Sequence, residues 1–292
     1  MQVAIYARIL PSEYGQDIHA LLEELTIKGI GVLMYKGLLD QFEDLHQRFT
    51  GIGVFEDGAS LRRDIDCLIS LGGDGTILDT VTLVGDKDIP ILGVNFGRLG
   101  FLTGASREEF SNVLGELINQ NYIIDSRALI HLDAGIPLFG DTPFALNDFT
   151  ITKRDAAPMI VVRTFLNGEF INSYYADGLI VSTATGSTGY SMSCSGPIVF
   201  PDAASFIITP IAPHHLNTRP ILVSDNNVIS FEVESRAEDY LCTLDARREV
   251  VNNSVKLAIR KENFTIKLIR FKENSFLSTL RSKLSWGFDK RN

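Results

Sequence analysis

The stretch Cys67–Thr76 constrains the fold more than any other part of the sequence. It begins as a short apolar run that leads directly into Gly-Gly-Asp-Gly-Thr, and Ile77–Val84 then has the spacing of an amphipathic helix. A strand, a glycine turn and a helix in this order are how a parallel sheet presents a ligand at the carboxyl ends of its strands. The glycines let the backbone approach a bulky anion, with amide N–H groups and a helix N-terminus facing it. We therefore expect a phosphate-binding loop made of Gly72, Gly73, Gly75 and Thr76.

Asp74 is the unexpected member of this turn, because a carboxylate repels phosphate. The acid makes sense if it holds Mg²⁺ or takes a proton from an attacking hydroxyl, both of which phosphoryl transfer needs. A tight turn with a solvated acid is the alternative for this pentapeptide taken alone. Asp74 is thus the candidate catalytic residue, and the sequence leaves open whether it is the base or the organiser of the metal.

The hydrophobic pattern changes part-way along the chain and indicates two domains. Over roughly the first hundred residues, strand-like runs alternate with helical spacing, which favours a parallel, doubly wound sheet. From about residue 122, short alternating runs separated by turns predict antiparallel strands, with a hairpin at Asn167-Gly168. We expect an α/β N-terminal domain over 1–103 and a β-rich C-terminal domain over 104–271. A last helix within 272–292 is expected to pack back on the first domain.

Two polar segments in the second half are candidates for ligand binding. The loop from Asp177 to Ser193 is dense in hydroxyls and glycines and follows an apolar strand, which suits a ligand rich in hydrogen-bonding groups. Asn147-Asp148 offers an amide suited to the edge of a base and a carboxylate suited to ribose hydroxyls. An ordinary surface loop and a solvated turn are the alternatives for the two segments.

The composition excludes several classes of function. The formal charge of −9 argues against a general nucleic-acid or anionic-membrane surface, so we expect no nucleic acid and no membrane as partners. The three cysteines are far apart and fit a reducing compartment. No apolar run approaches the roughly 20 residues of a membrane span, and a strand-like segment begins at once without a basic leader. We expect a cytoplasmic protein.

Missing motifs narrow the enzyme class further. The sequence has no Gly-Lys pair, and hence no Walker-type P-loop. It has no G-x-G-x-x-G fingerprint, which weakens the case for a dinucleotide redox enzyme, and no G-x-S-x-G nucleophile elbow of a serine hydrolase.

Taken together, these motifs resemble the NAD kinase family over about residues 66–223, with a looser continuation to the C-terminus. The Gly-Gly-Asp-Gly element alone is shared with lipid kinases of the diacylglycerol type and is similar to one in phosphofructokinases. The long loop and the Gly-x-Leu-Gly-Phe-Leu element are much more specific. The matching segments, in the family's order, are 72–76, 95–103, 147–148, 177–193 and 211–214, with Arg219-Pro220 beyond.

The resemblance implies ATP-dependent phosphorylation of the 2′-hydroxyl on the adenosine ribose of NAD, giving NADP, with Mg²⁺ or another divalent cation as cofactor. Asp74 then corresponds to the family's proton acceptor. Part of the pocket comes from a neighbouring subunit in the family, so a homodimer or homotetramer is implied, with oligomerisation through the β-rich domain. The implied NAD-binding residues are Asp74, Gly75, Asn147, Asp148, Asp177, Thr188, Gly189, Tyr190, Ser191, Met192, Ser193 and Ala212.

The chain departs from the family pattern at several positions. Asp148 stands where Glu is usual and is one methylene shorter, and Tyr175 stands where many relatives have a basic residue. Ala184 and Gly189 replace a commoner Pro and Ala, and Asp-Ala-Arg at 245–247 replaces a frequent Asp-Gly-Gln, so no role is carried over there.

Two other functions remain as alternatives to an NAD kinase. A lipid or sugar kinase could share the glycine turn, although the sequence has no evident patch for docking to a membrane. A non-catalytic sensor of NAD or another nucleotide could share the fold, although the intact Asp74 argues against it.

Overall fold

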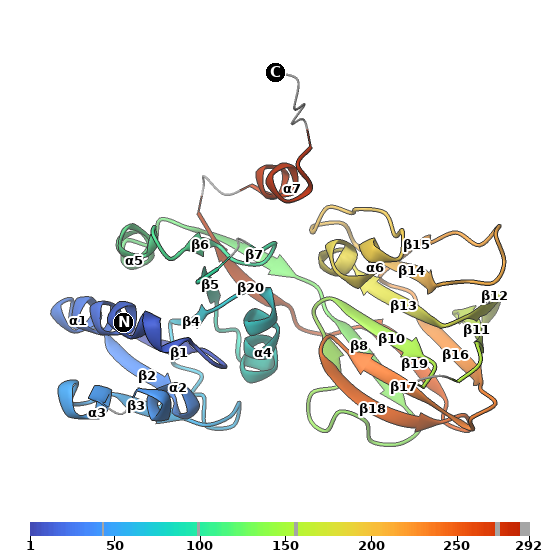
Figure 1. Cartoon of the computed structure of the whole chain (residues 1–292), viewed down its shortest axis with the longest axis horizontal. Coiled ribbons are helices and arrows are strands. Elements are labelled where there is room, and N and C mark those ends of the chain that lie inside the picture. Colours follow the sequence, from blue (N-terminus) through green and yellow to red (C-terminus); the bar gives the residue numbers. More distant parts are fainter. Residues whose placement is uncertain (43, 98–99, 155–156, 272–274, 287–292) are drawn as a thin grey trace. The chain divides into compact units, whose positions relative to one another are not determined.

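The computed structural model of the chain describes residues 1–292 except 43, 98–99, 155–156, 272–274 and 287–292. The chain divides into two compact units, Met1–Ser126 with Ile266–Asn292, and Arg127–Thr265 (Figure 1). No helix formed by these described residues is long and apolar enough to cross a membrane.

The first unit is built on an eight-stranded sheet with the order β3-β2-β1-β4-β5-β20-β7, and β6 pairs with β5. The pairs β1–β2, β1–β4, β4–β5 and β5–β20 are all parallel. The strands are β1 Gln2–Tyr6, β2 Gly31–Tyr35, β3 Gly53–Phe55, β4 Cys67–Leu71, β5 Ile91–Asn95, β6 Ala105–Ser106, β7 Ile123–Arg127 and β20 Ile266–Arg270. The helices are α1 Gly15–Ile27, α2 Lys36–Gln41, α3 Asp44–Arg48, α4 Asp74–Val84, α5 Phe110–Ile118 and α7 Phe276–Leu284, with 3₁₀ turns η1 Ser12–Tyr14 and η2 Gly85–Lys87.

The central strand β4 is the segment predicted from the apolar run, and all five of its residues are buried. A strand with helices over both faces of its sheet is expected to read as a continuous apolar run, and this one does. The main core of the unit joins Val3 and Ile5 of β1 to Ile18, Leu22 and other residues of α1. The α/β class expected for the N-terminal part is confirmed.

The second unit is a sandwich of two antiparallel six-stranded sheets, ordered β15-β14-β13-β10-β17-β18 and β12-β11-β16-β19-β8-β9. The first sheet contains β10 Asp148–Thr152, β13 Gly178–Thr183, β14 Ser205–Ile211, β15 Ile221–Ser224, β17 Asp239–Leu244 and β18 Arg247–Asn252. The second contains β8 Ile130–Ala134, β9 Phe144–Ala145, β11 Ile160–Leu166, β12 Glu169–Ala176, β16 Ile229–Glu234 and β19 Leu257–Lys261. A 3₁₀ turn, η3 Thr185–Thr188, and the short helix α6 Tyr190–Ser193 follow β13.

The core of this unit lies between its two sheets, where Phe149 of β10 and Phe231 of β16 have ring centroids 5.9 Å apart. The predicted hairpin joins β11 to β12, and Asn167 and Gly168 have φ of 52° and 85°, which suit the primed turn that the dipeptide indicated. The β-rich class expected for the second half is confirmed.

The division of the chain differs from the expected boundary at residues 103 and 104. Residues 104–126 group with the first unit, because β6 pairs with β5 and α5 contributes Val113 and Leu114 to the first core. The strand β20, expected among the β-rich residues up to 271, instead extends the parallel sheet through Leu268 and Ile91. Of the helix expected within 272–292, α7 at Phe276–Leu284 is described, and residues 272–274 and 287–292 lie outside the described part.

Candidate active site

The glycine turn after β4 has the geometry that close approach of an anion requires. Gly72 has a φ of 151°, and a Cβ at this position would lie 2.2 Å from the Oγ1 of Thr76. Gly73 is the N-cap of α4 and provides no side-chain hydrogen bond to the first turn of the helix. An ideal Cβ built on Gly73 or Gly75 meets nothing within 4 Å, so the start of the helix is open. Backbone N–H groups and the helix dipole therefore favour an anion here.

The carboxylate of Asp74 is fixed by the loop that follows β5. One oxygen accepts the backbone N–H of Phe101 at 2.8 Å and the other accepts that of Leu102 at 3.0 Å. Gly100 is required at the preceding position, because a Cβ there would lie 1.8 Å from the Oδ1 of Asp74. The sequence singled out both segments as motifs but gave no sign that one holds the other. Arg98 and Leu99 of this loop lie outside the described residues.

Two side chains shape the same loop from its ends. The amide oxygen of Asn95 accepts the N–H of Gly97 at 2.9 Å, and the hydroxyl of Thr103 accepts the N–H of Gly100 at 3.0 Å. Both side chains are buried, so they hold the described ends of the loop from inside the unit. The bond between Gly100 and Thr103 spans the two residues whose N–H groups bind Asp74, and it therefore helps to position them.

Asn147 and Asp148 stand at the start of β10 in the second unit, and Asp245 holds their backbone. The carboxylate of Asp245 accepts the N–H groups of Leu146 at 2.9 Å, Asn147 at 2.8 Å and Asp148 at 3.2 Å. Asp245 has a left-handed backbone, with φ of 54°, and directly follows β17. No role was assigned to it from sequence, because Asp-Ala-Arg at 245–247 departs from the family's frequent Asp-Gly-Gln; its partners lie 97 to 99 residues away.

The two acids make this part of the second unit electrostatically unusual. Burial, followed by the charge of Asp245, raises the pKa of Asp148 to about 8. Burial also raises the pKa of Asp245, although its three N–H donors act in the opposite direction. Asp148 is therefore mainly protonated at neutral pH, and its carboxyl group can donate as well as accept a hydrogen bond.

The hydroxyl-rich loop folds directly against Asn147 and Asp148. A Cβ on Gly186 would lie 2.1 Å from the carbonyl oxygen of Asn147, and one on Gly189 would lie 3.8 Å from the Oδ2 of Asp148. The Ser191 hydroxyl pairs with that of Thr209 at 2.8 Å in a fully buried position. The segment predicted at Thr188, Gly189, Tyr190, Ser191, Met192 and Ser193 thus adjoins the Asn-Asp pair.

Asp177 precedes β13 and Ala212 follows β14, and the two residues lie together at the end of these strands that is farther from Asp148. The N–H of Asp177 donates to the carbonyl of Ile211 at 3.0 Å, and Lys153 pairs with the Asp177 carboxylate at 2.8 Å. Ala212 has a φ of 44°, which is uncommon for a residue other than glycine. In the β10–β13 pairing, Asp148 faces Ser182 and Thr152 faces Gly178. About four residues, or roughly 13 Å of strand, therefore separate Asp148 from the end of the pair next to Asp177.

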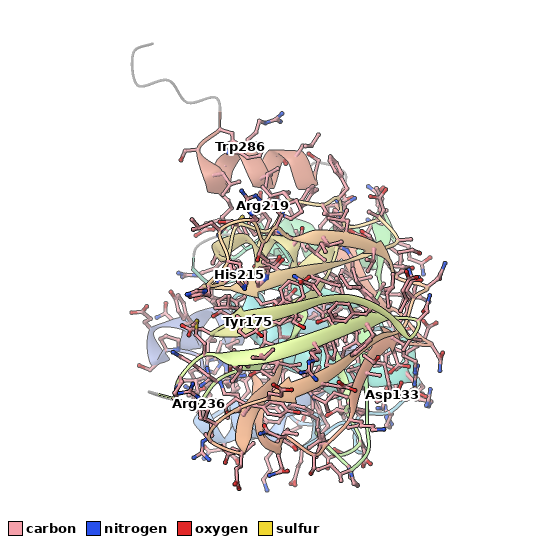
Figure 2. The ribbon with its side chains drawn as sticks, turned by 90° about the vertical axis from the view of Figure 1, so that its right-hand side faces the viewer. Asp133, Tyr175, His215, Arg219, Arg236 and Trp286 are labelled. Carbon is pink, nitrogen blue, oxygen red and sulfur yellow. The ribbon has the colours of Figure 1, made fainter. Side chains whose placement is uncertain are left out.

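The two neighbouring histidines are on the surface near Tyr175. The rings of Tyr175 and His215 meet edge to face with centroids 5.6 Å apart. Both residues are labelled in Figure 2. His214 packs on His215 at 5.5 Å, and its N–H donates to the carbonyl of Tyr175. Both histidines are exposed. Within the described part of the chain, no three His, Cys, Asp or Glu side chains form a group able to hold a metal ion.

Comparisons with known proteins identify the family. Residues 56–122 match the model of the ATP-NAD kinase N-terminal domain, and residues 146–271 match that of the ATP-NAD kinase C-terminal domain. The NAD kinase of Cytophaga hutchinsonii is 52% identical over 227 residues, which cover 78% of each chain. The NAD kinase of Flavobacterium psychrophilum is 42% identical over 297 residues and covers both chains completely. The chain belongs to the NAD kinase family.

A solved structure agrees in fold with this member of the NAD kinase family. An NAD kinase from Archaeoglobus fulgidus in complex with ATP superposes with a TM-score of 0.76 at 26% identity, covering 98% of this chain and 99% of that one. The Gly-Gly-Asp-Gly-Thr turn and the loop after β5 fall within the N-terminal match, and the Asn-Asp pair and the hydroxyl-rich loop fall within the C-terminal match. The resemblance inferred from these motifs is confirmed.

Proposed function

We propose that the chain acts as the NAD kinase of its family by using Asp74 to activate the acceptor hydroxyl. The reaction moves the γ-phosphoryl group of ATP to the 2′-hydroxyl of the adenosine ribose of NAD. A ribose hydroxyl is a poor nucleophile at neutral pH and needs a base within hydrogen-bond reach. The observation that carries the proposal is the fixed carboxylate of Asp74, held by the N–H groups of Phe101 and Leu102 beside an open helix N-terminus.

The residues of the glycine turn fit the phosphates of the donor. A Cβ added at Gly73 or Gly75 would meet nothing within 4 Å, so no neighbouring side chain crowds the backbone at the start of α4. Preorganised donors of this kind stabilise the charge of a transferring phosphoryl group without reorganising during the reaction. We assign the turn at Gly72–Thr76 to the donor phosphates, and this assignment agrees with the loop expected from sequence.

A divalent cation fits at Asp74 but has no cage made of protein alone. Each carboxylate oxygen of Asp74 accepts one N–H group, so each keeps a lone pair for another partner. Mg²⁺ commonly binds through one or two carboxylates together with substrate phosphates. Asp74 would be the protein ligand, and the bound ion would neutralise charge on the phosphates.

We assign the adenosine half of NAD to Asn147, Asp148 and the adjoining loop at 188–193. The amide of Asn147 can both donate and accept, as the edge of a base requires, and the protonated carboxyl of Asp148 can do the same toward ribose hydroxyls. The shorter side chain of Asp148 is buried beside Gly189, where an added Cβ would lie 3.8 Å from its Oδ2, so the carboxyl group adjoins the loop assigned to the adenosine half.

Asp177 and Ala212 are assigned to the nicotinamide half of an NAD held by a neighbouring subunit. Their position at the far end of the β10–β13 pair from Asp148 supports a contribution to a second copy's site. We therefore propose a homodimer or homotetramer that acts in the cytoplasm. Mixing Asp74→Asn with Asp177→Asn chains tests this, because about a quarter of randomly assembled shared sites contain neither substitution. Activity that stays additive after subunit exchange would place both acids in one subunit.

The proposed role of Asp74 is tested by Asp74→Asn in an assay of NADP formation from NAD and Mg-ATP. The substitution keeps the shape but removes the basicity, so we expect kcat to fall about 100-fold or more. The variant should still fold, at a cost of about 1–3 kcal/mol, because the Asn side chain can accept only one of the two backbone N–H groups that Asp74 binds. Binding of NAD, measured by calorimetry, checks that the site is still formed. A near-normal kcat would refute the role. NAD binding without any NADP in the unsubstituted chain would favour the sensor, and phosphate on diacylglycerol alone would favour the lipid kinase.

A further inference from the structure

Arg8 is held at the edge of the first unit's sheet where the glycine turn lies. It follows β1, which pairs with β4 so that Tyr6 faces Ser70, and both strands end within two residues of that pair. The guanidinium donates from Nε to the Oδ2 of Asp79 at 2.6 Å and from Nη2 to the Oδ1. Asp79 belongs to α4, the helix that begins at the turn.

The arrangement around Asp79 positions the guanidinium more than it stabilises the fold. The Tyr6 hydroxyl donates to the Oδ2 of Asp79 at 3.2 Å, so the carboxylate is held by two residues of the same sheet edge. The Arg8 side chain is 61% exposed and that of Asp79 is 20% exposed, and ion pairs this exposed contribute little stability. Asp79 occupies two of the five N–H donors of a guanidinium, which leaves three for a ligand.

We propose that Arg8 binds the non-transferred phosphates of the donor nucleotide. The proposal rests on the proposed function, in which the transferred phosphoryl group lies at Asp74. Asp79 is five residues after Asp74 on α4, roughly 7–8 Å along the helix axis, so the guanidinium that Asp79 holds lies about one and a half helical turns from the reacting group. A planar guanidinium matches phosphate oxygens in pairs. On a chain with a formal charge of −9, a fixed cation at this edge offsets the repulsion that two anionic substrates would meet.

The decisive comparison is Arg8→Gln against Arg63→Gln. Arg63 is also exposed and donates two hydrogen bonds to the carboxylate of Asp86, at 2.8 and 3.0 Å, just beyond the C-terminal end of α4. Both substitutions remove one positive charge from an Arg–Asp pair, but only Arg8 lies at the edge of the sheet that carries the glycine turn. We expect Arg8→Gln to raise the KM for ATP roughly 10- to 100-fold, the loss typical of a charged hydrogen-bonding partner. Arg63→Gln should leave that KM unchanged, and neither should alter the KM for NAD.

Binding of Mg-ADP, measured by titration calorimetry, separates recognition from turnover. The affinity should fall by a similar factor in Arg8→Gln and remain unchanged in Arg63→Gln. Two milder variants test the same contact. Arg8→Lys keeps the charge but loses the paired N–H donors, and Asp79→Asn loses the carboxylate that holds Arg8. Both should lower the affinity for Mg-ADP by a smaller factor, and they serve as the test if Arg8→Gln is unstable. Equal Mg-ADP affinities in the Arg8 and Arg63 variants would overturn the inference. If the unsubstituted chain makes no NADP from Mg-ATP, the proposed function itself fails.

Discussion

Replacing Asp148 by Asn should stabilise the protein, and the gain should grow with pH. The structure raises the pKa of Asp148 from 3.8 to about 8, chiefly through burial. A carboxyl group whose pKa is raised in the folded state stabilises that state below its ordinary pKa. This stabilisation is lost as the pH rises toward the folded pKa. Asn carries no charge at any pH, so the variant avoids the whole loss.

The size of the effect follows from the same shift. Each pKa unit corresponds to about 1.4 kcal/mol, so the difference between the two proteins should approach on the order of 5 kcal/mol above pH 8 and vanish near pH 4. For domains of this size that difference is worth on the order of 10 °C in melting temperature. Because the protonated carboxyl of Asp148 and the amide that replaces it are both neutral donors, the KM for NAD at pH 7 should change little by comparison.

Calorimetric melting curves from pH 4 to 9 measure this difference. The control is Asp202→Asn, which replaces an exposed acid of the same unit and, as a surface substitution, should change the free energy of unfolding by no more than about 0.5 kcal/mol. Comparing each variant with the unsubstituted chain at the same pH removes the contribution of all other titrating groups. A stability difference for Asp148→Asn that is absent at pH 8, or equally large at pH 4, would refute the reasoning.

Two further substitutions test individual contacts. Gly100→Ala should lower kcat about 100-fold, because the new methyl group would lie 1.8 Å from the Oδ1 of Asp74 and displace the carboxylate. The control is Gly115→Ala at an open helical position of α5, which should retain full kcat. Ser191→Ala should lower the free energy of unfolding by about 1–3 kcal/mol, because it leaves the buried Thr209 hydroxyl without its partner at 2.8 Å. An unchanged melting temperature would contradict that role.

Local patterns predicted the segments that form the site, whereas contacts distant in sequence were out of reach. The strand at Cys67–Leu71, the glycine turn and the Asn167-Gly168 hairpin depend on residue types within a few positions of one another. Asp74 is instead held by N–H groups 27 and 28 residues away, and Asp245 binds groups 97 to 99 residues away. Any backbone N–H can donate to a carboxylate, so no residue type marks these partners.

The same limit explains the domain boundary. The strand β20 has the short apolar alternation of the antiparallel strands that precede it, and only its pairing with β5 shows that it belongs to the first sheet. Periodicity gives the type of an element but not the neighbour with which it pairs.

The inner position of β20 has a consequence for how the protein is made. Residues 127–265 are synthesised before β20, which then enters the first sheet between β5 and β7. At about 5–20 residues per second, a ribosome needs on the order of ten seconds to cross that interval. During this time the sandwich has all of its strands, while the sheet that carries Asp74 lacks one. The half of the chain that is synthesised first is therefore the half that is completed last.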